Sequence, residues 1–416
     1  MALKETVASQ AQRIQLLEEL VHALKHRQFG ASSEKASPQQ NLFNEAEPYV
    51  KTATKPKQPI EKNIASPGLL AHIAVSKYAD ALPLYRQTVM FKRIGVELSR
   101  SNLANWMVRG GDLLQPLINR LHEVLTEQTV LHMDETPVQV LKEPGKTAQS
   151  KSDMWVMRNT RSTAQGDDVA DELAPSGVLY HYAASRSQQT PNDLLADYHG
   201  ALMVDGYAGY QPACEQHRIT RLGCWAHARR KFVEAQAVAR QKAGSKTGRA
   251  GKADKAMADI QKLYRVELQA KTLTDDERYR LRQEKAKPLI DKLKTWADKS
   301  VDQVPPKSAI GKALHYLHNQ WPYLVRYLEN GAYPIDNNPA ENAIRPFVVE
   351  RKNWLFANSQ AGARASANLY SVIETTKAND LEPCAYLKDI FAEPPNATTL
   401  EDIDALLPWN SKGGVG

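Results

Sequence analysis

Cysteine is scarce in this sequence, with only Cys214, Cys224 and Cys384 among 416 residues. Three scattered cysteines cannot form a disulfide framework in a protein of this size, so a reducing compartment is indicated. Long apolar runs are also missing, because none reaches the roughly 18 residues of a membrane span. The start of the chain, with Lys4 and Glu5, lacks the apolar core of a signal peptide. We therefore expect a cytoplasmic protein with no membrane partner.

The bulk composition is that of a globular protein, with 42% hydrophobic and 24% charged residues. The chain is long enough for two or three domains, each with its own core. The net charge of +7 is modest but unevenly distributed. Between Arg221 and Lys255 there are ten Lys or Arg and only two acids, Glu234 and Asp254. A solvated surface helix would explain such a run, but contact with a phosphate backbone is favoured.

Two apolar runs of strand length end in an aspartate. Residues 130–133 precede Asp134, and residues 201–204 precede Asp205. We expect both carboxylates at the ends of buried strands, where open α/β sheets keep their chemistry. Many strands end in an aspartate simply because aspartate favours turns, so neither run alone is specific evidence for a catalytic acid.

A third acid is predicted on a helix. Asn338 is the expected N-cap, Pro339 the first helical residue, and Glu341 belongs to the first turn. Asn338 and Glu341 could simply be a capping pair. Combined with Asp134 and Asp205, however, Glu341 completes the ligand set of nucleases and transposases with a ribonuclease-H-like fold. Carboxylates suit Mg²⁺, and two such ions assist in-line phosphoryl displacement.

The region before these acids is predicted to be helical. Residues 1–28 carry a heptad pattern, which fits a short coiled coil or a single amphipathic helix, and residues 29–66 are predicted to be a linker. Within a helical region at 67–125, residues 84–93 and a helix capped by Ser99 resemble a helix-turn-helix or an ordinary helical hairpin. In the first case Arg100, Asn102 and Asn105 would meet DNA.

The remaining pattern predicts an α/β fold with an interrupted core. Residues 126–232 are expected to form the first part of a ribonuclease-H-like core, with strands near 154–157, 178–182 and 219–224 and a helix at 192–198. A helical insertion is predicted at 233–332. The closing helix of the core is expected within 333–392, followed by a C-terminal tail at 393–416.

Together these stretches closely resemble the transposases of the insertion sequence 66 family, over almost the whole chain. The shared motifs occur in order and are, by residue number, 29–30 with 33–35, 66–71, 77–78 with 82–86, 134–138, 205–210, 224–232, 336–338 with Glu341, 351–356 and 406–409. The family usually has a cysteine-rich zinc-finger segment before the region at Pro67, and no cysteine precedes Cys214 here. Glu350 also stands where a glycine is common, adding a negative charge near expected phosphate contacts.

The resemblance implies a DDE-type transposase. Asp134, Asp205 and Glu341 would hold two Mg²⁺ ions, for which Mn²⁺ could substitute, with Asp134 bridging both. Such enzymes hydrolyse a phosphodiester at each element end and join the freed 3′ hydroxyl to target DNA. The implied partners are end and target DNA, further copies of the chain and possible helper proteins, and the implied location is the prokaryotic nucleoid.

Several other residues are candidates for supporting roles. Cys224 and His227 have the spacing of half a zinc site, but a lone pair of this kind is more often a structural hydrogen-bonding unit. Arg345, one turn from Glu341, could pair with it or clamp a phosphate. The expected DNA contacts beyond the helical region are Arg229, Arg230, Lys231, Arg345, Arg351 and Lys352. A catalytically silent DNA-binding remnant is the alternative function, and a ribonuclease acting on hybrids has little support.

Overall fold

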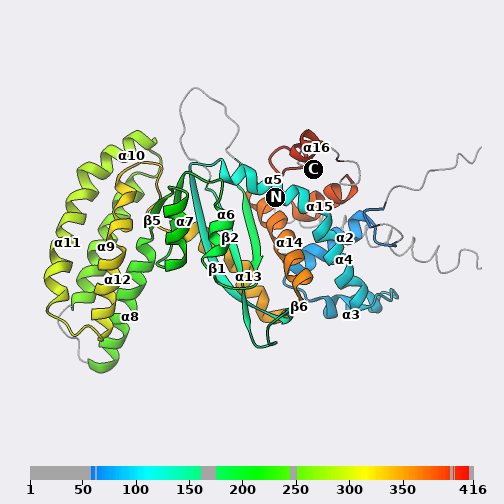
Figure 1. Ribbon diagram of the computed structural model, residues 1–416, viewed down its shortest axis with the longest axis horizontal. Helices are drawn as coiled ribbons and strands as arrows, with labels where there is room; N and C mark the ends of the chain where they lie inside the picture. Colours follow the sequence, from blue (N-terminus) through cyan, green and yellow to red (C-terminus); the bar gives the residue numbers. More distant parts are fainter. Residues whose placement is uncertain are drawn as a thin grey trace, which may run out of the picture.

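The computed structural model describes residues 58–60, 63–160, 175–243, 251–393, 397 and 399–411. The predicted heptad segment at 1–28 and most of the predicted linker lie outside these residues. A sheet occupies the middle of the molecule, between a block of long helices at one end and a group of shorter helices at the other (Figure 1). Among the described residues, no helix combines the length and apolar character that a bilayer crossing requires.

The fold is mixed α/β, built on a six-stranded sheet with the order β3-β2-β1-β4-β5, in which β6 also pairs with β1. Strand β2 pairs antiparallel with both of its neighbours, β1 and β3, whereas β4 and β5 run parallel to β1. The strands are β1 (Val130–Lys142), β2 (Lys151–Arg158), β3 (Val178–Ala183), β4 (Ala201–Val204), β5 (Thr220–Gly223) and β6 (Ala357–Ser359).

Strand β1 is longer than predicted. It does not end at Asp134, because its pairing with β2 runs from His132 to Gln139. Its opposite edge is shared between two short partners, β4 at residues 130–132 and β6 at residues 140–142. Within the described chain, the stretch of this edge between them has no strand partner. Asp134 therefore lies in the middle of a strand, beside a gap in the sheet.

Among the described residues, the helices before the sheet are α2 (Pro67–Tyr78), α3 (Leu84–Arg93), α4 (Arg100–Leu113) and α5 (Gln115–Thr126). The predicted bounds of α3 are confirmed, as is the Ser99 cap of α4, whose hydroxyl accepts from the Asn102 amide at 3.1 Å. Helix α4 packs closely on α14, since a Cβ added at Gly111 would lie 2.6 Å from the Cα of Ala365. These helices share one hydrophobic core with the sheet.

Helices after the long helical segment close this core. Helix α13 (Asn338–Trp354) packs against β1 and β2, and α14 (Gln360–Ala378) packs against β3 and α4. Helices α15 (Pro383–Ala392) and α16 (Leu400–Ala405) pack on α2 and α5 (Figure 1). Two short helices, α6 (Gln189–Leu194) and α7 (Gln211–Gln216), flank β4 in the chain. We call this whole assembly, β1–β6 with α2–α7 and α13–α16, the sheet body.

Five helices between β5 and α13 form a second unit, the helical block, with a hydrophobic core of its own. They are α8 (Trp225–Ala243), α9 (Lys252–Gln269), α10 (Asp275–Leu281), α11 (Lys287–Val301) and α12 (Ala309–Leu324). Helix α8 runs across the predicted boundary at residue 232. The Trp225 amide donates to the Ile335 carbonyl at 3.1 Å, so the chain enters and leaves the block at neighbouring points.

Candidate functional site

Asp134 and Asp205 belong to adjacent parallel strands. The last pair in register is His132 with Met203, and two further steps along each chain lead to Asp134 and Asp205. Strand β4 ends at Val204, so Asp205 follows a strand end as predicted. Its carboxylate accepts from the Tyr207 amide at 2.8 Å, which fixes a tight turn. The sheet thus places both aspartates beside the gap in β1.

A buried asparagine that the sequence analysis did not single out connects α13 to this gap. Asn337 is 0% exposed, and its amide group donates to the Met133 carbonyl at 2.8 Å and bonds His132 Nδ1 at 3.0 Å. The predicted N-cap, Asn338, is instead the first helical residue. Its side chain donates to Asp336 at 2.9 Å. Asn337 therefore fixes where α13 begins, four residues before Glu341.

Asp134 lies within electrostatic reach of the other two predicted acids. Its pKa is raised to about 7, mainly by burial and then by the nearby carboxylates of Glu135, Asp205 and Glu341. Burial also lowers the pKa of His132 to about 4, so its ring is neutral at physiological pH. Asp205 and Glu341, distant from Asp134 in the sequence, therefore both disfavour its ionisation.

Glu135, next to Asp134, has a different environment. Its side chain is 3% exposed, bonded by Arg186, and accepts from the Tyr210 hydroxyl at 2.5 Å. Arg186 also stacks on Tyr207, 3.9 Å from its guanidinium carbon to the ring centre. Burial raises the pKa of Glu135. These contacts join β1 to the turn after Asp205, and no residue spacing in the sequence predicts them.

Glu341 bonds with α8 of the helical block. Arg230 donates to Glu341 Oε2 at 2.7 Å, and His227 Nδ1 lies 3.4 Å from Glu341 Oε1. Arg345, considered as a partner from its helical spacing, is exposed and does not pair with Glu341 in the described structure. The Cys224 sulfur, His227 and Glu341 donor atoms all lie within 4.8 Å of one another. Burial raises the pKa of Cys224 to about 12 and lowers that of His227.

The predicted basic contacts differ in accessibility. Arg229, Arg345 and Lys352 are exposed, whereas Lys231 lies 3.7 Å from Glu234. Half-buried Arg351 donates to the Thr136 hydroxyl at 3.4 Å, on the strand face that Asp134 shares by the period of two. Arg221, part of the basic run, is 4% exposed and donates to the Asp205 carbonyl, so it supports the site from within the protein.

On helix α4 the predicted DNA-contacting residues are accessible. Arg100, Asn102 and Asn105 are exposed, while Leu103 and Trp106 are buried in the core. The expectation that Glu350 adds charge near phosphate contacts is wrong. Its side chain is buried and accepts from the Tyr370 hydroxyl at 2.5 Å. Burial raises the pKa of Glu350 to about 7.

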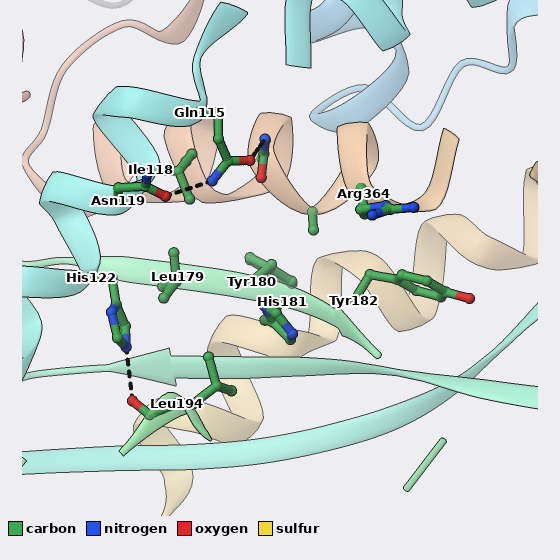
Figure 2. A pocket seen from close by; sticks show the side chains of 12 residues that line it. Gln115, Ile118, Asn119, His122, Leu179, Tyr180, His181, Tyr182, Leu194 and Arg364 are labelled. Carbon is green, nitrogen blue, oxygen red and sulfur yellow. Dashed lines mark hydrogen bonds between the residues drawn. The ribbon is translucent and has the colours of Figure 1, made fainter. Parts of the chain in front are cut away.

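A cavity of about 240 Å³ lies elsewhere, between α5, β3 and α14. Figure 2 shows His122 bonding the Leu194 carbonyl and Gln115 bonding Asn119 along its wall. The cavity is lined by twelve residues, among which Asp134, Asp205 and Glu341 do not occur. The candidate site is therefore the acid cluster beside the gap in β1.

The fold is that of a mixed α/β protein, in which Asp134 and Asp205 lie on neighbouring segments of the sheet and Glu341 bonds with α8. In comparisons with protein-family models, the model described as transposase IS66 family matches residues 62–365. A model of the IS66 C-terminal element matches residues 371–409. A third, described as transposase C of IS166 homeodomain, matches residues 16–74. The chain belongs to the IS66 transposase family.

Relatives of similar sequence are known from Sinorhizobium fredii. The uncharacterized protein y4qI is 33% identical over 367 residues, which cover 86% of this chain and 65% of the relative. The uncharacterized protein y4jD is 30% identical over 371 residues, covering 87% of this chain and 69% of the relative. The chain thus spans about two thirds of the length of these relatives.

Proposed function

We propose that this protein is a DDE-type transposase that cleaves DNA at the ends of its element and joins the freed 3′ hydroxyl to target DNA. The observation that supports the proposal is that Asp134 and Asp205 follow the same register on neighbouring chain segments and that Glu341, far away in the sequence, acts electrostatically on Asp134. Family membership supports it. Other residues of the same charge, such as Glu350, are buried elsewhere in hydrogen bonds.

The core is proposed to be ribonuclease-H-like. Three antiparallel strands followed by two parallel strands, with β1 in the centre, support this assignment. The helical block then interrupts the core between β5 and α13, as the sequence pattern predicts. Carboxylates on two neighbouring strands and on a covering helix are what such a core would need for phosphoryl transfer.

The donor set fits magnesium. Asp134, Asp205 and Glu341 offer hard oxygen ligands, and a bound cation would offset the burial and the nearby negative charges that raise the pKa of Asp134. These three residues would hold the ions, and Mn²⁺ would be accepted by the same oxygens. Bound Mg²⁺ would lower the pKa of the attacking water and neutralise charge on the leaving oxygen.

The chain's own residues would position the acids and the DNA. Asn337 holds the start of α13 against Met133 and His132, and would in this way orient Glu341 toward the two aspartates. Neutral His132 serves as a structural partner in this arrangement. Exposed Arg229, Arg345 and Lys352, with half-buried Arg351, would contact phosphates around the acids. Helix α4 would bring Arg100, Asn102 and Asn105 to DNA.

Two ends must be held together for transposition, so we propose that the active form contains more than one copy of the chain. Duplexes of end DNA are the proposed substrate, and a target duplex is the second. Helper proteins of the same element are further proposed partners.

The decisive experiment compares Asp134→Asn with the parent protein and with Asp197→Asn, a control at an exposed position. With Mg²⁺ and labelled end DNA, we expect cleavage and strand transfer to fall to background in Asp134→Asn only. Asparagine keeps the shape of the Asp134 side chain but removes its charge, so a gel shift should show that Asp134→Asn binds DNA within about twofold of the parent. Equal strand-transfer yields from both variants would remove Asp134 from the mechanism. Binding without cleavage by the parent would favour the DNA-binding remnant.

A further inference from the structure

We infer that Cys224, His227 and Glu341 form a binding site for a thiophilic divalent cation of the Zn²⁺ class. The sulfur, imidazole nitrogen and carboxylate oxygen that would bind it lie within 4.8 Å of one another. The first two come from the start of α8 and the third from the first turn of α13. This site shares Glu341 with the all-oxygen set proposed for magnesium, but it differs from that set in its thiolate and imidazole donors.

Local structure brings the three side chains together. Cys224 immediately precedes α8, and His227 lies in the first turn of that helix, so the two-residue spacing places both donors at one helix end. The Asn337 amide donates to the Cys224 sulfur at 3.2 Å, which ties the start of α13 to the start of α8. Backbone amides that bond a sulfur in this way commonly support metal-bound thiolates.

Two of the donor atoms lack a hydrogen bond to any described residue. His227 Nδ1 and Glu341 Oε1 are both buried from solvent, and their one recorded contact is the 3.4 Å ion pair with each other. Buried polar atoms normally have partners, so each unpaired one calls for an explanation. A cation bound to both atoms would satisfy them. Arg230 occupies the other oxygen, Oε2, and leaves Oε1 free for the metal.

The geometry suits a three-ligand zinc site with one open position. Zinc bonds of about 2.0 to 2.3 Å in tetrahedral array place donors about 3.5 Å apart. The present atoms would have to close by about 1 Å, which side-chain rotation can provide. Thiolate and imidazole donors favour Zn²⁺ or Co²⁺ over Mg²⁺. On binding, the Cys224 thiol loses its proton to solvent and its sulfur forms the bond to the metal.

The first test is a Co²⁺ titration of the purified full-length protein under reducing, metal-free conditions and without DNA. Cobalt reports a thiolate ligand through its sulfur-to-metal charge-transfer absorption. We expect one equivalent to produce this band and Zn²⁺ to displace it. Cys214→Ser and Cys384→Ser, the matched controls, should retain the band, and Cys224→Ser should lose it. No band in the parent, or an undiminished band in Cys224→Ser, would overturn the inference.

A second variant covers the chance that Cys224→Ser misfolds, because Cys224 is buried. His227→Gln replaces a less buried ligand, and circular dichroism verifies its fold. We expect the Zn²⁺ affinity of this variant to fall at least tenfold. An unchanged affinity in the folded variant would overturn the inference. The readout is metal binding alone, so its failure leaves the proposed DNA cleavage untouched, and failure of cleavage leaves this inference standing.

Discussion

The sheet body and the helical block differ in what they bring to the site. The sheet body supplies the hard oxygen donors Asp134 and Asp205 from strands with a shared core. The block supplies Arg230 and His227 from the first turns of α8. Tyr316 of α12 also touches the site, since a Cβ at Gly206 would lie 2.8 Å from its ring.

This difference shows that the helical block is more than a spacer between Asp205 and Glu341. Its own core makes it a candidate for independent folding, yet its first helix holds the carboxylate of Glu341. The proposed chemistry thus depends on the junction of two cores. Variants that weaken one core, or the junction, test this interpretation.

The largest effect is expected from Arg282→Met in the block. Arg282 is 1% exposed, bonds Glu267 at 2.9 and 2.7 Å, and donates to the Tyr327 carbonyl at 2.7 Å. Its loss leaves the half-buried Glu267 carboxylate and the Tyr327 carbonyl without their guanidinium partner, which costs about 3 kcal/mol. We expect calorimetry to show the block unfolding first while the transition of the sheet body is unchanged. The exposed control Arg280→Met should match the parent, and a single transition that shifts as a whole would contradict two independent cores.

A smaller effect is expected from Asn337→Ala at the junction. The substitution leaves the Met133 carbonyl and His132 without their buried partner, which should lower the free energy of unfolding by about 2 to 3 kcal/mol. Because Glu341 would lose its fixed position, Mg²⁺-dependent cleavage should fall more than stability alone explains. Denaturant titration and the cleavage assay measure both effects. Asn338→Ala, at an exposed position, is the control, and equal losses in the two variants would argue against Asn337 as the positioning residue.

The smallest expected effect concerns pH and the sheet body alone. The pKa of Glu350 is about 7 in the folded protein, above its ordinary value of 4.5. The folded state therefore prefers the protonated acid, and stability is lost as pH rises from about 4.5 through 7.

Glu350→Gln should remove this loss and raise the free energy of unfolding by about 1 to 2 kcal/mol at pH 8, with no gain near pH 4. Urea titrations at both pH values measure it, with the exposed Glu97→Gln as control. The transition of the helical block should not move. A gain that is the same at both pH values would show that ionisation of Glu350 is not the cause.

Local features of the fold were predictable because their causes are local. The bounds of α3 and the Ser99 cap follow from periodicity and capping within a few residues. Strand β4 was recognised from an apolar run that ends in Asp205. The end of β1 was not predicted correctly. Residues beyond Asp134 stay in the strand because they pair with β2, which lies further along the chain.

For the candidate site, the sequence predicts the acids but not the contacts that surround them. Family motifs indicate Asp134, Asp205 and Glu341, whereas the Arg230 to Glu341 bond joins residues 111 positions apart. Helical spacing suggested Arg345 as a partner of Glu341, but tertiary packing places Arg230 of α8 beside Glu341 instead. The role of Asn337 was also hidden, since its side chain bonds strand residues rather than capping its own helix.

The bond between the Trp225 amide and the Ile335 carbonyl gives the molecule a narrow neck. Because this bond holds together the two chain segments that enter and leave the helical block, the block behaves as a closed loop whose ends are already joined. The entropy cost of such a loop grows only slowly with its length. Related chains are consequently free to lengthen, shorten or exchange the distal helices during evolution, provided that the first turns of α8 keep their hold on Glu341.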